Sequence, residues 1–192
     1  TVLGFAFAVT LTALFAGKTK MWGAIPPYVS VILLFVLMGF VGMMEGMQIA
    51  LFAVLNMPEE ELTKHTIAHK NCQLTFSGQN LQAFLIGRQI CVTVCMFIVA
   101  RITSLDYTAG DSNIFGVSDG LQNFFNTGLM GAIITTIVGS LAWRIIASSF
   151  PLAFLSNPLI YLIIRLCLLL EASGLCSAAW VLARFNKPLA GY

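Results

Sequence analysis

Long apolar stretches separated by short polar segments dominate the pattern of this chain. A helix of about 20 apolar residues crosses the hydrocarbon core of a bilayer, so each charge-poor stretch of that length is a candidate span. The pattern predicts five such helices, at residues 1–17, 28–56, 77–103, 120–143 and 157–183. Pro26-Pro27 and Asn157-Pro158 suit helix starts, where amide donors have no partner in an earlier turn. We therefore expect an all-α membrane protein with a single transmembrane domain over residues 1–192.

Two of the polar connections have distinct characters. Residues 58–70 begin with a proline and three glutamates, which the positive end of a helix dipole favours, and continue with lysines and histidines among apolar residues. This pattern predicts a short amphipathic helix on the membrane surface between the second and third spans. His65 and His69 have metal-ligand spacing, but no third ligand is evident, and a solvated face is the better interpretation. Residues 101–119 are rich in Gly, Asp, Asn and Ser and predict a loop.

The composition excludes several classes of protein. Only 9% of the residues are charged and 58% are hydrophobic, whereas a soluble domain carries about 25% charged residues. The formal net charge of +2 is too small to indicate nucleic acid as a partner. Five scattered cysteines, mostly in apolar stretches, indicate free and buried thiols. No nucleophile–base pair or phosphate-binding loop is evident, so an enzyme is not expected.

Two polar motifs interrupt the second and third apolar helices: Glu45-Gly46-Met47-Gln48 and Gly87-Arg88-Gln89. A charge in hydrocarbon costs roughly 2.5–3.5 kcal/mol even on lenient scales, so such residues usually have a function. In antiparallel neighbours, Glu45 and Arg88 would each lie about 16 Å from the same membrane surface, at 1.5 Å per residue. We therefore predict that the motifs meet near the midplane and line a solute site formed by Glu45, Gln48, Arg88 and Gln89.

Structural interpretations of these residues stay open beside the functional one. An ion pair of Glu45 with Arg88 could serve stability alone. The second helix also carries small residues at helical spacing, which indicate close helix packing more than binding: Gly39, Gly42 and Gly46.

Other polar residues within the predicted spans need partners as well. Gln82, Gln89 and Thr93 fall on one stripe of the third helix. Arg165 and Glu171 of the fifth helix are about 120° apart around the helix axis, so each is expected to pair with a different helix. Whether these two residues serve structure or function is left open by the sequence.

The predicted orientation rests on a small charge difference. Lysines and arginines near the span ends number five on one side and three on the other: Lys18, Lys20, Arg101, Arg184 and Lys187 against Lys64, Lys70 and Arg144. The positive-inside rule then favours a cytoplasmic C-terminus.

The motifs carry a family resemblance. E-G-x-Q over residues 45–48, followed by G-R-Q over residues 87–89, resembles the silicon (silicic acid) transporters of diatoms and other silicifying algae. These are ten-helix chains of two five-helix halves, and half-length silicon transporter-like proteins carry one motif pair on five helices. The chain is most like one such half, a single five-helix repeat unit. Ile90 stands where the family often has Thr, and Cys95-Met96-Phe97-Ile98 departs from the family's C-M-L-D motif.

The resemblance implies a transporter of orthosilicic acid, coupled to sodium and placed in the plasma membrane. Orthosilicic acid is neutral at pH 7 and carries four hydroxyls. Glu45 can accept hydrogen bonds from it, Arg88 can donate, and Gln48 and Gln89 can do both. Glu45 is also the candidate sodium ligand, and no cofactor is expected. Alternating access is typically built from an inverted repeat, so one five-helix unit is expected to act as a homodimer or beside a second half.

A second likeness supplies an alternative function. Glu45, Ile49-Ala50-Leu51-Phe52 and Leu85-Ile86-Gly87 look like the membrane domain of the CorC/cyclin-M magnesium transporter family. That resemblance implies a sodium-coupled divalent-cation transporter. A membrane scaffold or assembly subunit without transport is a third interpretation. Uptake of silicic or germanic acid would distinguish the first from the others, and magnesium flux would identify the second.

Overall fold

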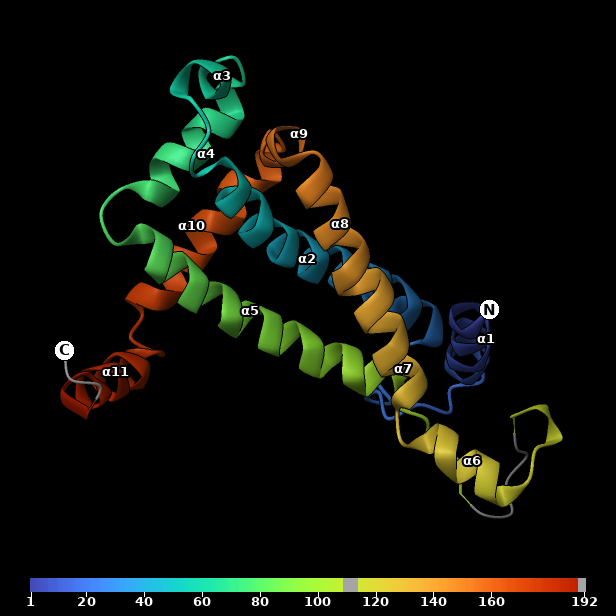
Figure 1. The fold of residues 1–192 in the computed structure, drawn as a ribbon. Coiled ribbons are helices and arrows are strands. Elements are labelled where there is room, and N and C mark those ends of the chain that lie inside the picture. Colours follow the sequence, from blue (N-terminus) through green and yellow to red (C-terminus); the bar gives the residue numbers. More distant parts are fainter. Residues whose placement is uncertain (109–113, 190–192) are drawn as a thin grey trace. The chain divides into compact units, whose positions relative to one another are not determined.

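The computed structural model describes residues 1–108 and 114–189, and these residues are mostly helical (Figure 1). In chain order the helices are α1 (Val2–Phe15), α2 (Pro27–Val54), α3 (Glu59–Thr63), α4 (Thr66–Phe76), α5 (Asn80–Thr103), η1 (Ile114–Gly116), α6 (Asp119–Asn126), α7 (Leu129–Ile134), η2 (Thr135–Leu141), α8 (Ala142–Ser149), α9 (Pro151–Leu155), α10 (Pro158–Ala172) and α11 (Ser177–Leu189). The all-α prediction is confirmed for the described residues. Residues 109–113 of the predicted loop lie outside them.

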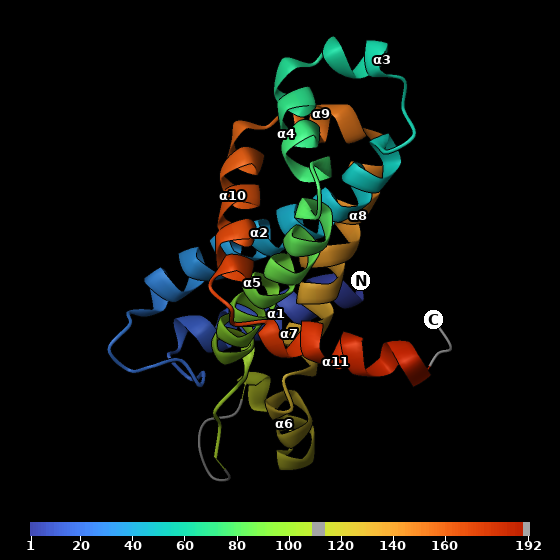
Figure 2. The ribbon, with the colours of Figure 1, turned by 90° about the vertical axis from the view of Figure 1, so that its left-hand side faces the viewer.

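Three helices are long and apolar enough to cross a membrane: α2, α5, and the continuous stretch Leu129–Ser149 formed by α7, η2 and α8. A fourth span results if α10 and α11 count together, although they are bent by 69° at the break between them (Figures 1 and 2). Within the described residues the structure thus supports three or four spans, and the predicted number of five is not confirmed. The chain is a helical membrane protein.

Local breaks explain the difference in the span count. α1 has 14 residues, which at 1.5 Å per residue is about 21 Å and short of the hydrocarbon core. The predicted span 120–143 had the wrong boundaries, because the chain adopts a left-handed turn at Gly128 with φ of 81° and the apolar helix starts only at Leu129. A second left-handed turn, at Gly174 with φ of 82°, separates α10 from α11.

The predicted surface helix is divided into α3 and α4, with His65 between them. The acidic first turn is present in α3, where Glu59, Glu60 and Glu61 follow Pro58. α4 contacts α9 and α10 and buries polar residues on that face, among them Asn71, whose Nδ2 donates to the carbonyl of Leu155 at 2.8 Å. α4 therefore packs against helices of the same unit through part of its surface.

The chain packs as two compact units, each made of segments distant in sequence. The first unit contains Thr1–Gly46 and Thr93–Ile146. In it α1 contacts α7, and the buried core combines residues of α1, α2, α5, α6 and α7, including Val9, Leu34, Ile102, Phe125 and Ile134. The start of α2 at Pro27 agrees with the proline signal of the sequence.

The second unit contains Met47–Val92 and Ala147–Tyr192. Its buried apolar residues include Phe84 of α5, and Ile160 and Ile164 of α10. α10 begins as the sequence predicts, because the Asn157 side chain accepts from the amide of Leu159 at 3.0 Å and Pro158 occupies the first turn. This cap fixes where the chain enters α10.

Candidate functional site

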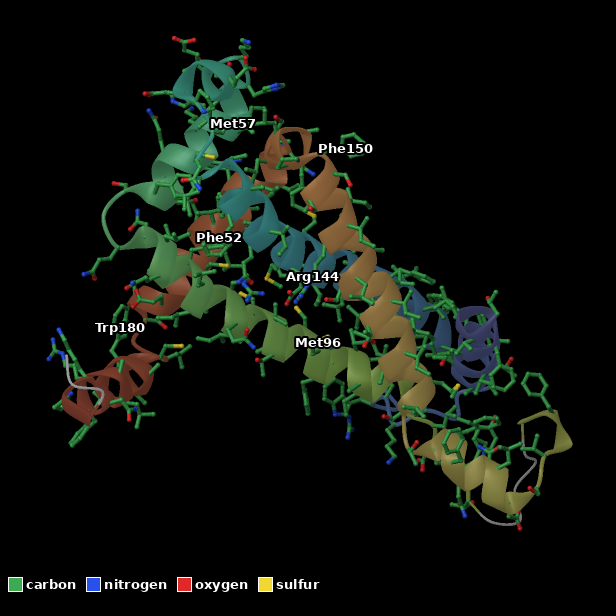
Figure 3. The ribbon with its side chains drawn as sticks, viewed as in Figure 1. Phe52, Met57, Met96, Arg144, Phe150 and Trp180 are labelled. Atoms are coloured by element: carbon green, nitrogen blue, oxygen red, sulfur yellow. The ribbon has the colours of Figure 1, made fainter. Side chains whose placement is uncertain are left out.

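Glu45 forms an ion pair inside the first unit. Its Oε2 accepts a hydrogen bond from Nη2 of Arg144 on α8 at 2.7 Å, and only 12% of the Glu45 side chain is exposed. Figure 3 labels Arg144 on α8. Both residues belong to helical stretches that are long enough to span a membrane. The structure thus supplies Glu45 with a cationic partner that the sequence did not predict.

Close packing one turn away from Glu45 positions this partner. Trp143, the residue before Arg144, packs so tightly against Gly42 of α2 that a Cβ at Gly42 would overlap the indole ring. Gly39 has no such neighbour, since nothing lies within 4 Å of a Cβ built there. The packing interpretation of the glycines therefore holds for Gly42, whose missing side chain lets α8 approach α2 beside Glu45.

The sequence placed Arg144 at the end of a span, and this was wrong. Charge-free windows end wherever a charge occurs, so the window stopped at residue 143, whereas the helix continues to Ser149. The apolar residues on both sides of Arg144, with Ile145 and Ile146 directly after it, could have predicted that the helix continues past this arginine. Because Arg144 lies inside a helix of spanning length, it no longer counts among the lysines and arginines near the span ends. The difference that favours a cytoplasmic C-terminus is then five residues against two.

A π-helix directly precedes this region. Residues Thr135–Leu141 form a π-helical segment between α7 and α8, and Arg144 follows three residues after its end. π-helical turns inside α-helices are rare and often lie at functional sites. The widened turn therefore adds local support for a functional role of this part of the chain.

The second motif lies on α5 in the second unit. A Cβ at Gly87 would overlap the backbone carbonyl of Cys167 on α10, so only glycine permits this contact between α5 and α10. Arg88 is buried, with 7% exposure, and Gln89 is exposed. The motif therefore combines a glycine required for packing, a buried cation and an exposed amide on successive residues of one helix.

The remaining predicted site residue, Gln48, is half-buried on α2 and belongs to the second unit. The two units are placed independently, so the meeting of Glu45 and Gln48 with Arg88 and Gln89 stays a prediction. Within the described residues, no three His, Cys, Asp or Glu side chains gather in the way a metal ion requires. Sodium binding at Glu45 stays a prediction.

Other polar residues of the apolar helices have partners in the second unit. Arg165 donates from Nε and Nη2 to the hydroxyl of Tyr161, at 3.1 Å and 2.8 Å, one turn earlier on α10. Among the described residues, Arg165 therefore pairs within its own helix, and not with another helix as predicted. Glu171 pairs with α11, where Trp180 Nε1 donates to its Oε1 at 3.0 Å. The five cysteines are free, and four of them are buried.

Apolar helices of spanning length, with charged residues inside them, define an integral membrane protein. The silicon transporter family model matches residues 1–192, and the chain therefore belongs to the silicon transporter family. The resemblance to the silicon transporter family is thus confirmed, and the family match supports a transporter role. The comparisons with curated proteins and with solved structures gave no match.

Proposed function

We propose that the chain transports orthosilicic acid across a membrane, coupled to sodium. The observation that carries this proposal is the silicon transporter family match over residues 1–192. The solute is a small neutral molecule with four hydroxyls. A site for it needs donors and acceptors at close range rather than a strong net charge.

The proposed site consists of Glu45, Gln48, Arg88 and Gln89. Its support is the residue chemistry within apolar helices: a largely buried carboxylate on α2, a buried guanidinium on α5 and an amide near each. These groups supply both the hydrogen-bond donors and the acceptors that the hydroxyls of the solute need. They lie inside apolar helices, where polar side chains usually mark a solute pathway.

The ion pair with Arg144 refines this proposal. Within the spans predicted from the sequence, Glu45 and Glu171 balance Arg88 and Arg165 in charge. Arg144 adds a third arginine. Charge balance alone therefore supports a neutral solute less well than before. Arg144 instead acts as a positioning residue that holds the Glu45 carboxylate in one orientation on α2 through their hydrogen bond.

This arrangement gives the sodium proposal a testable form. A sodium ion bound by the Glu45 carboxylate competes with Arg144, whose Nη2 lies 2.7 Å from Oε2. Replacing Arg144→Gln should therefore lower the sodium concentration needed for half-maximal uptake. The matched control is Arg165→Gln, because Arg165 contacts Tyr161 on its own helix. An unchanged sodium dependence in Arg144→Gln would remove Glu45 as the sodium ligand.

Uptake of germanic acid, an analogue of silicic acid, tests the function directly. The purified chain in liposomes should take up germanic acid down a sodium gradient, and silicic acid should compete with it. Magnesium flux is measured in the same vesicles. Magnesium uptake without germanic acid uptake would favour the divalent-cation alternative, and the absence of both would favour a scaffold role.

The proposal extends to assembly and location. We expect the chain to act as a homodimer or beside a second half, because alternating access around a midplane site usually relies on two related repeats. The plasma membrane is the proposed location, since uptake of silicic acid from outside the cell requires it.

A further inference from the structure

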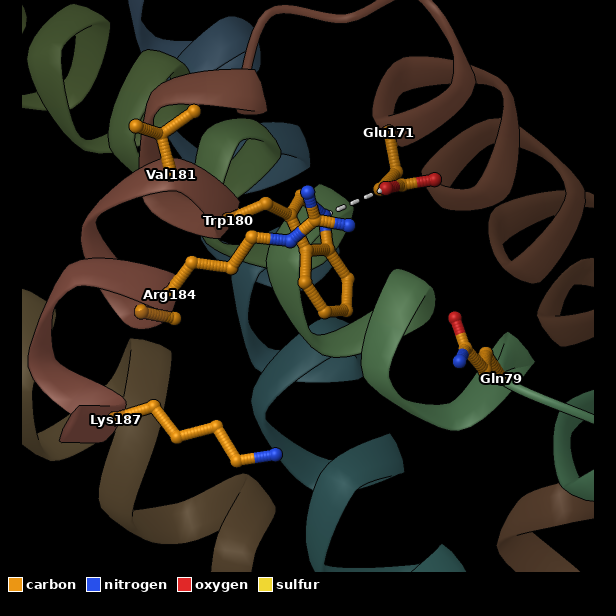
Figure 4. A pocket seen from close by; sticks show the side chains of 7 residues that line it. Gln79, Glu171, Trp180, Val181, Arg184 and Lys187 are labelled. Carbon is orange, nitrogen blue, oxygen red and sulfur yellow. Dashed lines mark hydrogen bonds between the residues drawn. The ribbon is translucent and has the colours of Figure 1, made fainter. Parts of the chain in front are cut away.

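Two hollows of different polarity adjoin each other in the second unit. The polar hollow, of about 630 Å³, is lined by Gln79, Glu171, Trp180, Arg184 and Lys187 among others (Figure 4). The apolar hollow, of about 260 Å³, is lined by Gln82, Leu85, Ile86 and Ala179 among others. Trp180 and Ala183 of α11 belong to both hollows. The two are thus neighbouring parts of one groove between α11 and the start of α5.

The polar hollow carries an excess of positive charge. Trp180, Arg184 and Lys187 follow one another at i, i+4 and i+7, so they share one face of α11. In Figure 4 the side chains of Arg184 and Lys187 extend from α11 toward the same side. Two cations against the single carboxylate of Glu171 leave a net positive charge. This charge suits a ligand with one negative charge.

Glu171 has a structural role in the same hollow. It accepts the 3.0 Å hydrogen bond from the indole of Trp180, which ties α11 to α10 across the turn at Gly174. The bond orients the indole at the border of the two hollows. The Trp180–Glu171 hydrogen bond therefore fixes one wall of the polar hollow without involving Arg184 or Lys187.

The order of the hollows along α5 matches the order of groups in a lipid. Gln79 directly precedes α5, whereas Leu85 and Ile86 lie about 10 Å further along it, at 1.5 Å per residue. The polar hollow thus adjoins the end of a spanning helix and the apolar hollow adjoins its interior. A lipid presents its charged headgroup and its acyl chains in this same order.

The outer face of α11 is suited to the membrane interface. Leu182 and Phe185 are 62% and 72% exposed, and they lie on a different face of α11 from Arg184 and Lys187. Helices with one apolar and one basic face lie in the plane of the interface, and tryptophan is enriched at that depth. The surroundings of the two hollows are therefore those of a lipid-facing surface.

We propose that the groove between α11 and the start of α5 binds an anionic phospholipid, with its phosphate against Arg184 and Lys187 and an acyl chain in the apolar hollow. A free phosphate shares the headgroup chemistry but has nothing to place beside Leu85 and Ile86. The continuity of the polar and apolar hollows therefore favours the lipid.

Native mass spectrometry of the purified chain in detergent tests this site. We titrate phosphatidylglycerol and phosphatidylcholine separately and expect tighter binding of phosphatidylglycerol. The double variant Arg184→Gln/Lys187→Gln should weaken it by about 25-fold, because each of the two cations near an anionic lipid contributes about fivefold. The matched control Lys64→Gln/Lys70→Gln removes two exposed lysines of the same unit and should leave the affinity unchanged.

Two further measurements separate the lipid from other causes. Ala179→Phe, which fills the apolar hollow without changing charge, should also weaken phosphatidylglycerol binding, and it tests the site even if the double variant fails to fold. Millimolar inorganic phosphate should not displace the lipid. Equal affinities for the two lipids, equal losses in both double variants, or displacement by phosphate would each overturn the proposal.

Discussion

At the scale of single residues, Glu45 and Arg144 should depend on each other for stability. Removing either partner leaves a charge inside an apolar helix, so Glu45→Gln and Arg144→Gln should each lower the melting temperature in detergent. Half of the Arg144 side chain is exposed, at 48%, and we therefore expect a coupling free energy of about 1 kcal/mol. A double-mutant cycle measures it.

The same cycle with Arg88→Gln tests the pairing that the sequence predicts for Glu45. Arg165→Gln serves as the control in both cycles, because its contacts lie on α10. Strict additivity with Arg144 would show that the ion pair does not contribute to stability. Strict additivity with Arg88 would show that Glu45 and Arg88 do not interact.

The amides of the two motifs should matter for transport rather than for folding. Gln89 is exposed and Gln48 is half-buried, so Gln48→Ala and Gln89→Ala leave the folded protein in the membrane. If the proposed site is correct, each substitution removes hydrogen bonds to the solute, whose loss costs about 1–3 kcal/mol when the partner stays unpaired, and uptake should be abolished. Gln73→Ala, an exposed amide on α4, is the control. Near-normal uptake in both variants would exclude these amides from the site.

At the scale of the helices, Gly87 should be indispensable for packing. A Cβ there would overlap the backbone of Cys167, which cannot move aside as a flexible side chain can. Gly87→Ala should therefore destabilise the protein by about 1–3 kcal/mol. Gly39→Ala, with open space around the new Cβ, should be neutral or slightly stabilising. Thermal melts of the two variants make the comparison, and equal melting temperatures would contradict it.

The short helix α3 should respond to pH through one ion pair. Lys64 Nζ lies 2.6 Å from Glu61 Oε1, and this hydrogen bond and the charge of Lys64 lower the pKa of Glu61. Because the pKa of Glu61 is lower in the folded than in the unfolded protein, the ion pair stabilises the fold at a pH above the unfolded-state pKa. This stabilisation is lost as the pH falls through the folded-state pKa. In an NMR titration, Lys64→Gln should raise the Glu61 midpoint. An unchanged midpoint would show that the pair does not persist in solution.

The helices differ in how well the sequence predicts them. The starts at Pro27 and Pro158 were predictable, because proline and an asparagine cap act locally. The breaks at Gly128 and Gly174 were not, because a glycine inside an apolar stretch continues a helix as readily as it ends one. The Glu45–Arg144 pair was not predicted, because the charge of Arg144 was interpreted as the end of a span although the helix continues to Ser149. The two polar motifs at residues 45–48 and 87–89 were recognisable because charges in hydrocarbon are rare.

At the scale of the whole molecule, polar groups on the surface of α5 need an environment other than lipid. Gln89 and Thr93 lie on one stripe of this helix, and both are exposed in the structure. Polar side chains at membrane depth almost always face protein or water. This stripe is therefore the surface of α5 that we expect a second copy of the chain, or a water-filled pathway, to cover.

We predict a homodimer with α2 and α5 near its interface, since oligomers most often form by two-fold symmetry. A cysteine introduced at Thr93 should cross-link two copies in a background where the half-exposed Cys176 is replaced by serine. A cysteine at Ile145, which is 67% exposed on α8, should not. The mass of the detergent complex gives an independent measurement. A monodisperse monomer that still transports germanic acid would refute the dimer, and the polar stripe of α5 would then line a pathway within one chain.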